Sequence, residues 1–281
     1  MRNHLGLFAT ATRFTVIEHA RNRFAMVLIA LFIPLWITLA YLVMPDTGAQ
    51  LRLRATGELI TAPGNELTEI SGALNAVTLI AGFMMFAATF NGGDFDRRLA
   101  MAGYPRTYLV LAKVTALALV SAAVAGYATA VICMTWEPRR PFLLAGALFC
   151  AAVTYGVLGV GFGSVLRREV EGMFAIVMTS IIDLGLQNPI TSSGADSPIT
   201  RYLPSYGAMQ ASTAAGFSVI AVPQYLGVQL VWFAGSALVC LLAFHHRTRN
   251  ALPAASRSMP RQAPPGDRAA AQNDDDRAAS C

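Results

Sequence analysis

Charged side chains are scarce in this chain, because Asp, Glu, Lys and Arg together make up only 13% of its 281 residues. Soluble domains carry about 25%. Hydrophobic residues reach 55%, and the mean hydropathy is +0.50. These values exclude an ordinary soluble domain of this length and predict a membrane protein.

Lysine is almost absent, since Lys113 is the only one in the chain. A phosphate-binding P-loop has glycine directly before its lysine, and that position is Ala112 here. A P-loop nucleotide site is therefore excluded, and an ATP-driven function requires an ATPase on another polypeptide. The twenty arginines that stand against the one lysine are typical of GC-rich bacterial genomes, so we expect a protein of a bacterial plasma membrane.

The sequence also lacks the patterns of metal, disulfide and nucleic-acid sites. Cys133, Cys150 and Cys240 lie in apolar runs and Cys281 is the last residue, so no spacing is typical of a metal site or a disulfide framework. No stretch interleaves basic and aromatic residues on one face, as nucleic-acid binding requires. We expect no metal, no cofactor and no nucleic-acid partner for this chain.

Long apolar runs predict the membrane crossings, each of which needs about 20 apolar residues. Five runs meet this length: Phe24–Met44, Gly72–Asn91, Leu109–Met134, Phe142–Leu166 and Tyr225–Phe244. A sixth run, Met173–Leu186, is shorter, because Gln187, Asn188 and Pro189 interrupt it. We predict an all-α polytopic membrane protein with six transmembrane helices, of which the fifth is short.

The arginines predict the orientation, because Lys and Arg in short loops favour the cytoplasmic side. With the N-terminus inside, the cytoplasmic segments hold fifteen arginines and the outer segments five. Both termini are therefore predicted to be cytoplasmic.

The chain divides into three parts. Residues 1–23 have apolar residues at helical spacing and predict an N-terminal interfacial helix, although a basic leader that only sets the orientation remains an alternative. Residues 24–249 form the transmembrane domain, with Pro34 predicted to bend the first span. Residues 250–281 are rich in Pro, Ala, Arg and Asp and predict a disordered cytoplasmic tail.

Two outer segments have different patterns. The stretch from Pro45 to Ser71 is polar and is predicted to be a loop. The stretch from Gln187 to Gln224 contains the apolar segment Ala211–Val222, which is too short to cross a bilayer. It predicts a re-entrant segment between helices five and six, or else an outer loop packed on the helices.

Asp183 is an acidic residue inside an apolar run, and such residues are functional candidates in membranes. Three interpretations stay open. Asp183 can line a translocation path together with Gln187, serve as the proton site of a secondary transporter, or be solvated at the outer surface if its helix begins higher.

An intramembrane serine protease is the enzyme alternative, because Ser164 follows a glycine-rich stretch and His245 ends the last run. The order Gly-x-Gly-Ser departs from the Gly-x-Ser-Gly of the rhomboid family. A glycine-rich stretch also allows helices to approach closely. This second interpretation is favoured, and we expect no catalytic residues.

A charged hinge from Asp94 to Lys113 joins the second and third runs. Asp94 and Asp96 are predicted to lie near the start of a short helix, where they favour its N-terminal dipole. Arg97 and Arg98 suit lipid phosphates or acidic groups of a partner. The residues that follow, Gly103, Tyr104, Pro105 and Arg106, predict a turn back toward the membrane.

Several of these residues resemble one transporter family. The hinge residues Asp96, Arg97, Arg98, Leu99, Ala102, Gly103, Tyr104, Pro105, Arg106, Thr107 and Lys113 resemble the loop between the second and third helices of ABC-2 type transporter permeases. Glu18, Arg21, Asn22, Arg23 and Pro34 resemble the family's N-terminal connecting helix and first span, and Tyr202–Gly207 resembles its outer segment before the last helix. The resemblance covers roughly residues 10–249.

The resemblance implies a permease subunit of an ABC exporter. Such a subunit pairs with a second permease copy, identical or not, and with a separate ATPase subunit that holds ATP and magnesium. It implies an ATPase-coupling role for Asp94, Asp96, Arg97, Arg98 and Gly103–Arg106, and a connecting-helix role for Glu18, Arg21 and Arg23. The expected cargo is a hydrophobic or amphipathic compound, such as an antibiotic, another small molecule or a lipid. A proton-coupled secondary transporter is the alternative.

Overall fold

The fold is given by a computed structural model that describes residues 4–53, 56–101, 106–166, 168–195, 197–219 and 222–255. The chain forms two compact units, Met1–Ala243 and Phe244–Cys281. The first unit contains the helices and the hairpin that are discussed below. Of the second unit, the structure describes the helical residues up to Ala255.

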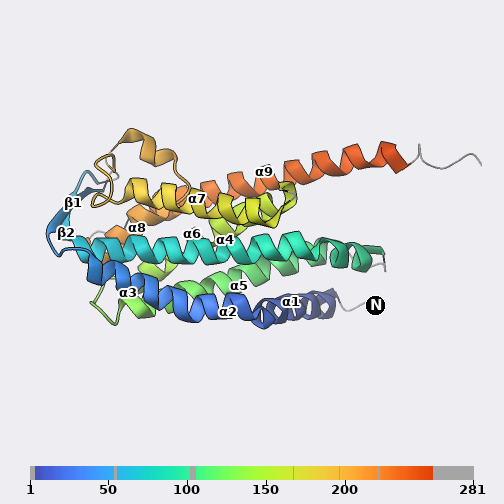
Figure 1. The fold of residues 1–281 in the computed structure, drawn as a ribbon, viewed down its shortest axis with the longest axis horizontal. Coiled ribbons are helices and arrows are strands. Elements are labelled where there is room, and N and C mark those ends of the chain that lie inside the picture. The colour runs from blue at the N-terminus through green and yellow to red at the C-terminus, as the bar shows by residue number, and fades with distance from the viewer. Residues whose placement is uncertain are drawn as a thin grey trace, which may run out of the picture. The chain divides into compact units, whose positions relative to one another are not determined.

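The described chain is mostly helical, and the long helices of the first unit run alongside one another (Figure 1). The helices are α1 (His4–Arg21), α2 (Arg23–Val27), a π-helical turn (Leu28–Phe32), α3 (Ile33–Val43), α4 (Gly64–Met101), α5 (Arg106–Ile132), α6 (Pro141–Val165), α7 (Glu169–Gln187), the 3₁₀ helix η2 (Pro198–Tyr202), α8 (Tyr206–Phe217) and α9 (Gln224–Ala255). α9 continues past residue 250, where the tail is predicted to begin; residues 256–281 lie outside the described residues.

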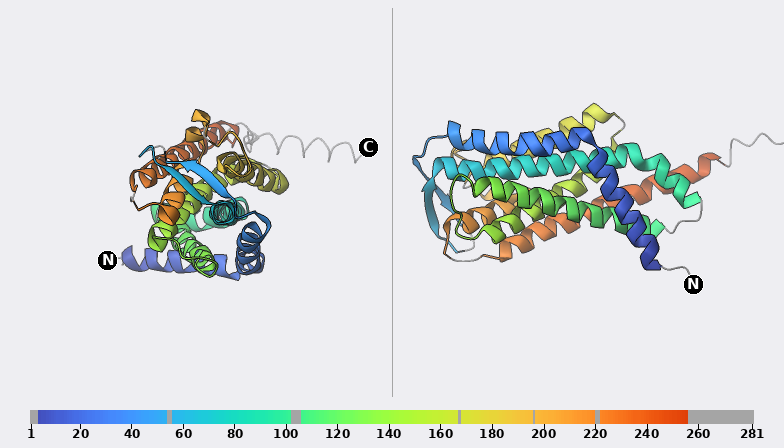
Figure 2. Two further views of the ribbon diagram at one scale, coloured as in Figure 1. Left: turned by 90° about the vertical axis from the view of Figure 1, so that its left-hand side faces the viewer. Right: turned by 90° about the horizontal axis from the view of Figure 1, so that it is seen from below.

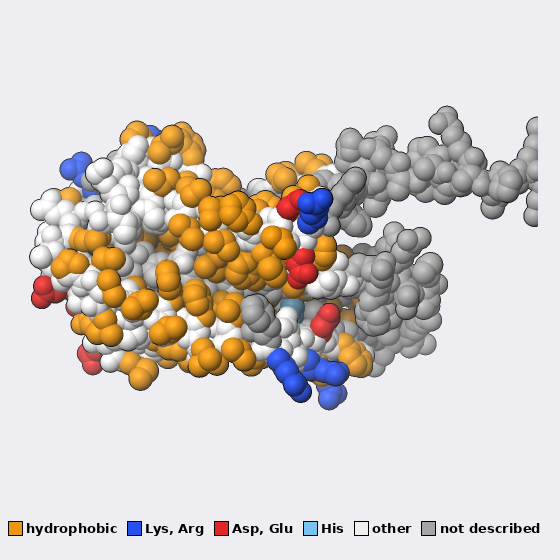
Figure 3. Space-filling model, viewed as in Figure 1, with side chains coloured by type: hydrophobic (Ala, Val, Ile, Leu, Met, Phe, Trp, Pro, Cys, Tyr) orange, Lys and Arg blue, Asp and Glu red, His pale blue; other side chains and the backbone are white. Residues whose placement is uncertain are grey.

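Five helices of the described chain are long and apolar enough to cross a membrane. They are Ala25–Val43, Gly64–Gly92, Tyr108–Ile132, Pro141–Val165 and Gln224–Leu242, close to the five long runs of the sequence. Hydrophobic side chains cover the middle of the surface seen in Figure 3, and many large ones on these helices are exposed. A water-soluble protein rarely exposes so large a contiguous apolar surface, so these features support a membrane protein.

The first span departs from a regular α-helix just before Pro34. Proline has no N–H for the carbonyl four residues earlier, which is that of Ala30, and the helix widens into a π turn at Leu28–Phe32. The hydroxyl of Tyr127 on α5 donates to the Ala30 carbonyl oxygen at 3.4 Å. A side chain of a neighbouring helix thus replaces the missing donor.

The prediction of a loop from Pro45 to Ser71 is wrong in part, because this stretch forms a β-hairpin and the start of α4. Strands β1 (Gly48–Arg52) and β2 (Leu59–Pro63) pair antiparallel, with Gly48 opposite Pro63. Their residues alternate between exposed and buried, as a strand with one face on the core does. Gly57, between the strands, has a φ of 70°, which glycine adopts at little cost.

The charged hinge also differs from its prediction. α4 continues to Met101, so Asp94 and Asp96 lie inside a long helix and the separate short helix is wrong. Helix extension is favourable once a helix has formed, and the pair Gly92–Gly93 does not stop it. Residues 102–105, where the turn is predicted, lie outside the described residues.

α4 lies at the centre of the first unit, since it packs against α3, α5, α6, α7 and α8. Its closest approach is to α6, where a side chain on Gly159 would meet the backbone oxygen of Gly82. Only glycine permits this spacing. By contrast, α1 lies crosswise to the spanning helices in the view along the bundle (Figure 2) and packs mainly on α5.

Candidate functional site

A buried polar cluster surrounds Asp183 inside the bundle. Asp183 and Gln187 are four residues apart on α7 and therefore share a face; Ser180 continues this face by one turn. The Asp183 side chain is only 1% exposed. The interpretation of Asp183 as a solvated residue at the outer surface is therefore wrong in this structure.

Both carboxylate oxygens of Asp183 accept hydrogen bonds. The Tyr155 hydroxyl on α6 donates to Oδ2 at 2.5 Å, and the Ser205 backbone N–H donates to the same oxygen at 2.9 Å. The Gln187 amide nitrogen donates to Oδ1 at 2.6 Å. Hydrogen bonds to a buried carboxylate offset part of its desolvation cost, so these three donors hold α6, α7 and the segment before α8 together.

The side-chain nitrogen of Gln187 lies near more acceptors than it has N–H groups, while the side-chain oxygen has no donor in the described part of the chain. Its nitrogen Nε2 lies within hydrogen-bonding distance of Asp183 Oδ1, the Asp183 carbonyl oxygen at 3.1 Å and Ser205 Oγ at 2.9 Å. A carboxamide has only two N–H groups for these three acceptors. Its oxygen Oε1 is buried and has no hydrogen-bond partner among the described residues.

Gln229 of α9 extends the cluster to the start of α8. Its nitrogen donates to Thr154 Oγ1 of α6 and to the Pro204 carbonyl oxygen, each at 2.9 Å, and its oxygen accepts from the Ala208 backbone N–H at 3.0 Å. The first N–H groups of a helix lack partners within that helix. Gln229 therefore accepts from the backbone N–H of Ala208 in the first turn of α8, while Asp183 accepts from that of Ser205 just before the helix.

A second set of buried contacts joins α7 to α4. Asn75 Nδ2 donates to Ser180 Oγ at 2.9 Å, and the hydroxyls of Thr78 and Ser180 lie 2.8 Å apart. Just after α7, Asn188 Nδ2 donates to Ser71 Oγ at 2.9 Å. α7 is thus held by polar contacts along its buried face.

α8 is itself almost completely enclosed, because every residue from Tyr206 to Gly216 is buried. It has 12 residues, fewer than a crossing needs. It packs mainly on α6 and also contacts α4 and α7. Part of the apolar segment predicted to be re-entrant, Ala211–Val222, is thus a helix inside the first unit.

Glu69 is a second buried carboxylate, which the sequence did not indicate because it was assigned to the outer loop. Thr135 Oγ1 donates to its Oε1 at 2.8 Å, and Trp136 Nε1 donates to its Oε2 at 2.7 Å. These bonds tie the first turns of α4 to the segment after α5 and satisfy both oxygens.

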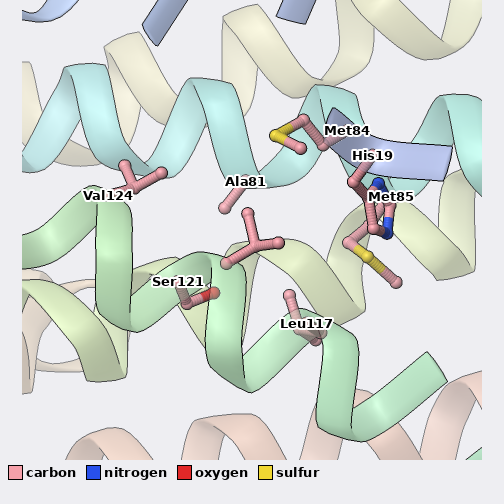
Figure 4. Close-up of a pocket in the computed structure, with 8 residues that line it drawn as sticks. His19, Ala81, Met84, Met85, Leu117, Ser121 and Val124 are labelled. Atoms are coloured by element: carbon pink, nitrogen blue, oxygen red, sulfur yellow. The ribbon is translucent and has the colours of Figure 1, made fainter. Parts of the chain in front are cut away.

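The N-terminal helix is docked through His19. This side chain is buried with Met84 and Met85 of α4 and with Leu117 and Ser121 of α5 around a cavity of about 10 Å³ (Figure 4). Burial lowers the pKa of His19 below its usual 6.5; Glu18 opposes this effect and Lys113 adds to it. Docking of α1 therefore favours the neutral imidazole.

The predicted connecting-helix residues, Glu18, Arg21 and Arg23, are all exposed at this end of the bundle, where a partner can reach them. The side chains of Asp94, Asp96, Arg97, Arg98 and Arg106, and all of Gly103, Tyr104 and Pro105, lie outside the described residues. Their coupling role stays a prediction.

The protease interpretation gains no support at Ser164. Its hydroxyl donates to the Gly161 carbonyl oxygen at 2.8 Å, within its own helix. A side chain on Gly163 would lie 3.0 Å from the Phe86 carbonyl oxygen of α4. These contacts favour the helix-packing interpretation of the glycines, while the His245 side chain lies outside the described residues.

Models of known protein families and curated protein sequences yield no match to this chain. Within the described ranges, no three His, Cys, Asp or Glu side chains are placed to hold a metal ion. The cluster offers one carboxylate, several hydroxyls and two carboxamides. Such groups can bind a polar part of a ligand or exchange hydrogen bonds when helices move.

Proposed function

We propose that this chain is the membrane subunit of an ATP-driven exporter of the ABC-2 type, with six crossings and both termini in the bacterial cytoplasm. The observation that carries the proposal is the buried α8 between α7 and α9. Because α8 is too short to cross, it is a re-entrant element between the fifth and sixth spans. Polar groups of such an element are tolerated at membrane depth where protein surrounds them.

α7 is the fifth span in this proposal. Its 19 residues extend about 28 Å at 1.5 Å per residue, close to the hydrocarbon thickness. It carries Glu169 and Glu171 in its first turn, at the end where the chain returns from α6. Asp183 and its partners enclose the polar groups of its other half.

The energy for transport comes from ATP hydrolysis on a separate ATPase subunit, because the chain has no P-loop lysine. α4 is the element suited to transmit it, since one continuous helix joins the charged segment at Asp94–Arg98 to Asn75, which contacts α7. A displacement at the α4–α5 connection is thereby carried to the polar cluster. Binding of ATP can shift the helices only through contacts that differ between two states.

The cargo in this proposal is a hydrophobic or amphipathic compound, and Asp183 with Gln187 faces its path in the second state. A second permease copy, identical or not, completes the transporter. The buried carboxylate of Asp183 favours one other candidate, a proton-coupled secondary transporter, because carboxylates inside bundles also serve proton transfer.

Reconstitution separates the two candidates. The chain is co-expressed with a candidate ABC ATPase subunit, and both are placed in proteoliposomes with a fluorescent amphipathic dye as cargo. The exporter requires the ATPase and ATP; dye movement driven by a proton gradient without the ATPase supports the alternative instead.

A charge reversal tests the coupling residues. We expect Arg97→Glu with Arg98→Glu to insert normally but to lose co-purification with the ATPase. The matched control is Arg52→Glu with Arg139→Glu, which changes two exposed arginines in predicted outer segments and should retain the ATPase. Normal ATP-driven efflux by the Arg97 and Arg98 variant would rule out the coupling role.

A further inference from the structure

A cleft of about 470 Å³ opens beside the start of α9. It is lined by Arg201 and Tyr202 of η2, Tyr206 of α8 and Val228 of α9. Three consecutive elements thus contribute one cation, two aromatic rings and an aliphatic side chain. A ligand with an anionic head and an apolar body matches this lining.

The guanidinium of Arg201 is held in position by its own segment. Its Nε donates to the Pro198 carbonyl oxygen at 2.9 Å, and its central carbon lies 5.5 Å from the centre of the Tyr202 ring. Arginine has five N–H donors, and this bond uses one. The planar remainder is suited to a phosphate group, which guanidinium binds with paired hydrogen bonds.

An apolar stripe on α9 continues from the cleft. Val228, Val231, Leu238 and Leu242 recur at helical spacing on one face of the helix, and all four are exposed. The stripe extends about 21 Å at 1.5 Å per residue. This length accommodates an acyl chain, and inorganic phosphate makes no use of it.

On the proposed topology, the cleft opens at the outer end of the last span, at the level of the lipid headgroups. Val228 is one turn into the apolar span Gln224–Leu242, while Arg201 and Tyr202 lie in the segment before it. Tyrosine and arginine are enriched where a membrane meets water. The charge is therefore located at the headgroup level and the stripe below it.

We infer that the cleft binds an anionic phospholipid, with the headgroup phosphate on Arg201 and one acyl chain along the α9 stripe. The site requires no ATPase, and its Tyr206 directly follows Ser205, whose backbone N–H binds Asp183. It holds for the isolated chain whether or not the chain is an exporter.

Native mass spectrometry of the chain alone in detergent measures the binding. Phosphatidylglycerol is titrated against phosphatidylcholine and inorganic phosphate. We expect phosphatidylglycerol to bind most tightly, because the choline cation opposes Arg201. Arg201→Gln should weaken phosphatidylglycerol binding about fivefold. Arg52→Gln, which changes an exposed arginine of β1, should leave it unchanged.

A photoreactive phosphatidylglycerol provides a second test on the unmodified chain, and it decides the matter if Arg201→Gln fails to fold. Labelling of the peptide that contains Pro198–Tyr206 supports the site. Equal lipid binding by Arg201→Gln, inorganic phosphate binding as tight as the lipid, or labelling confined to other peptides overturns it. Crosslinking of the α9 stripe to a second copy of the chain also overturns it.

Discussion

The bond between Tyr155 and Asp183 offers a sharp test of the buried cluster. In the wild-type chain, Tyr155→Phe removes a donor from the Asp183 carboxylate, and a hydrogen bond to a charged group contributes about 1.5–3 kcal/mol. In an Asp183→Leu background the same change has the opposite effect. The Tyr155 hydroxyl then retains only the Thr179 carbonyl oxygen at 3.5 Å, so Tyr155→Phe removes a poorly satisfied donor.

An unsatisfied buried donor costs about 1–3 kcal/mol. Tyr155→Phe should therefore destabilise the wild-type chain and stabilise the Asp183→Leu variant. The coupling free energy between the two sites combines both effects, and we expect it to reach about 1–1.7 kcal/mol, the upper range for hydrogen bonds within membrane bundles. The wild type, the two single variants and the double variant form a double-mutant cycle, in which the desolvation cost of the carboxylate cancels.

The free energy of unfolding is measured by titration with sodium dodecyl sulfate in mixed micelles, with helix content followed by circular dichroism. Tyr127→Phe is the matched control, since Tyr127 bonds the Ala30 carbonyl oxygen and has no part in the cluster; it should show no coupling to Asp183→Leu. If Tyr155→Phe costs the same in both backgrounds, the hydrogen bond does not hold the cluster together.

Three further predictions concern packing, pH and the second carboxylate. Gly159→Ala should lower thermal stability by about 1–3 kcal/mol, because its side chain meets the α4 backbone; Gly146→Ala on the same helix has open space and should leave the melting temperature unchanged. Burial lowers the pKa of His19, so docking of α1 should weaken as the pH falls below 6.5. Proteolysis within α1 should therefore increase at these pH values. His19→Gln should abolish this pH dependence. Glu69→Leu should cost about 1–3 kcal/mol and shift the fluorescence of Trp136, which loses its acceptor.

The spans could be predicted from the sequence because apolar length is a local property. The run Phe142–Leu166 becomes α6, Pro141–Val165, almost residue for residue. The helix irregularity near Pro34 is local as well, since proline lacks one backbone donor. The membrane character of the fold was therefore accessible without tertiary contacts.

The hairpin and the first turns of α4 were missed for an opposite reason. Residues such as Glu69 and Ser71 are polar, and polarity indicates a loop or a helix end when no partner is known. Each is buried in the structure and bonded to a segment distant in sequence: Glu69 to Trp136 and Ser71 to Asn188. Tertiary hydrogen bonds thus override the local pattern.

Only some residues of the polar cluster around Asp183 could be predicted from the sequence. The sequence indicated that an acidic residue in an apolar run faces a cavity or a partner, and Gln187 was predicted to line a path with Asp183; their four-residue spacing on α7 puts both on one face. Tyr155 lies 28 positions from Asp183 and Ser205 lies 22, so their roles depend on how α6 and α8 pack. A tyrosine in the middle of an apolar run was the available signal, because its hydroxyl must find an acceptor.

The unsatisfied oxygen of Gln187 marks the point where this cluster has a donor to gain. A buried acceptor without a donor costs about 1–3 kcal/mol, so a donor from a neighbouring group or a water molecule would stabilise it. A shift of α7 against α8 that gives Gln187 Oε1 a donor would recover this free energy while it breaks the bond to Ser205. Two arrangements that exchanged hydrogen bonds in this way would be interconverted by ligand or partner binding if they differed by a few kcal/mol. Apolar contacts along the same interface would lack this discrete exchange, which is a physical reason to find carboxamides and hydroxyls where α7 meets α8.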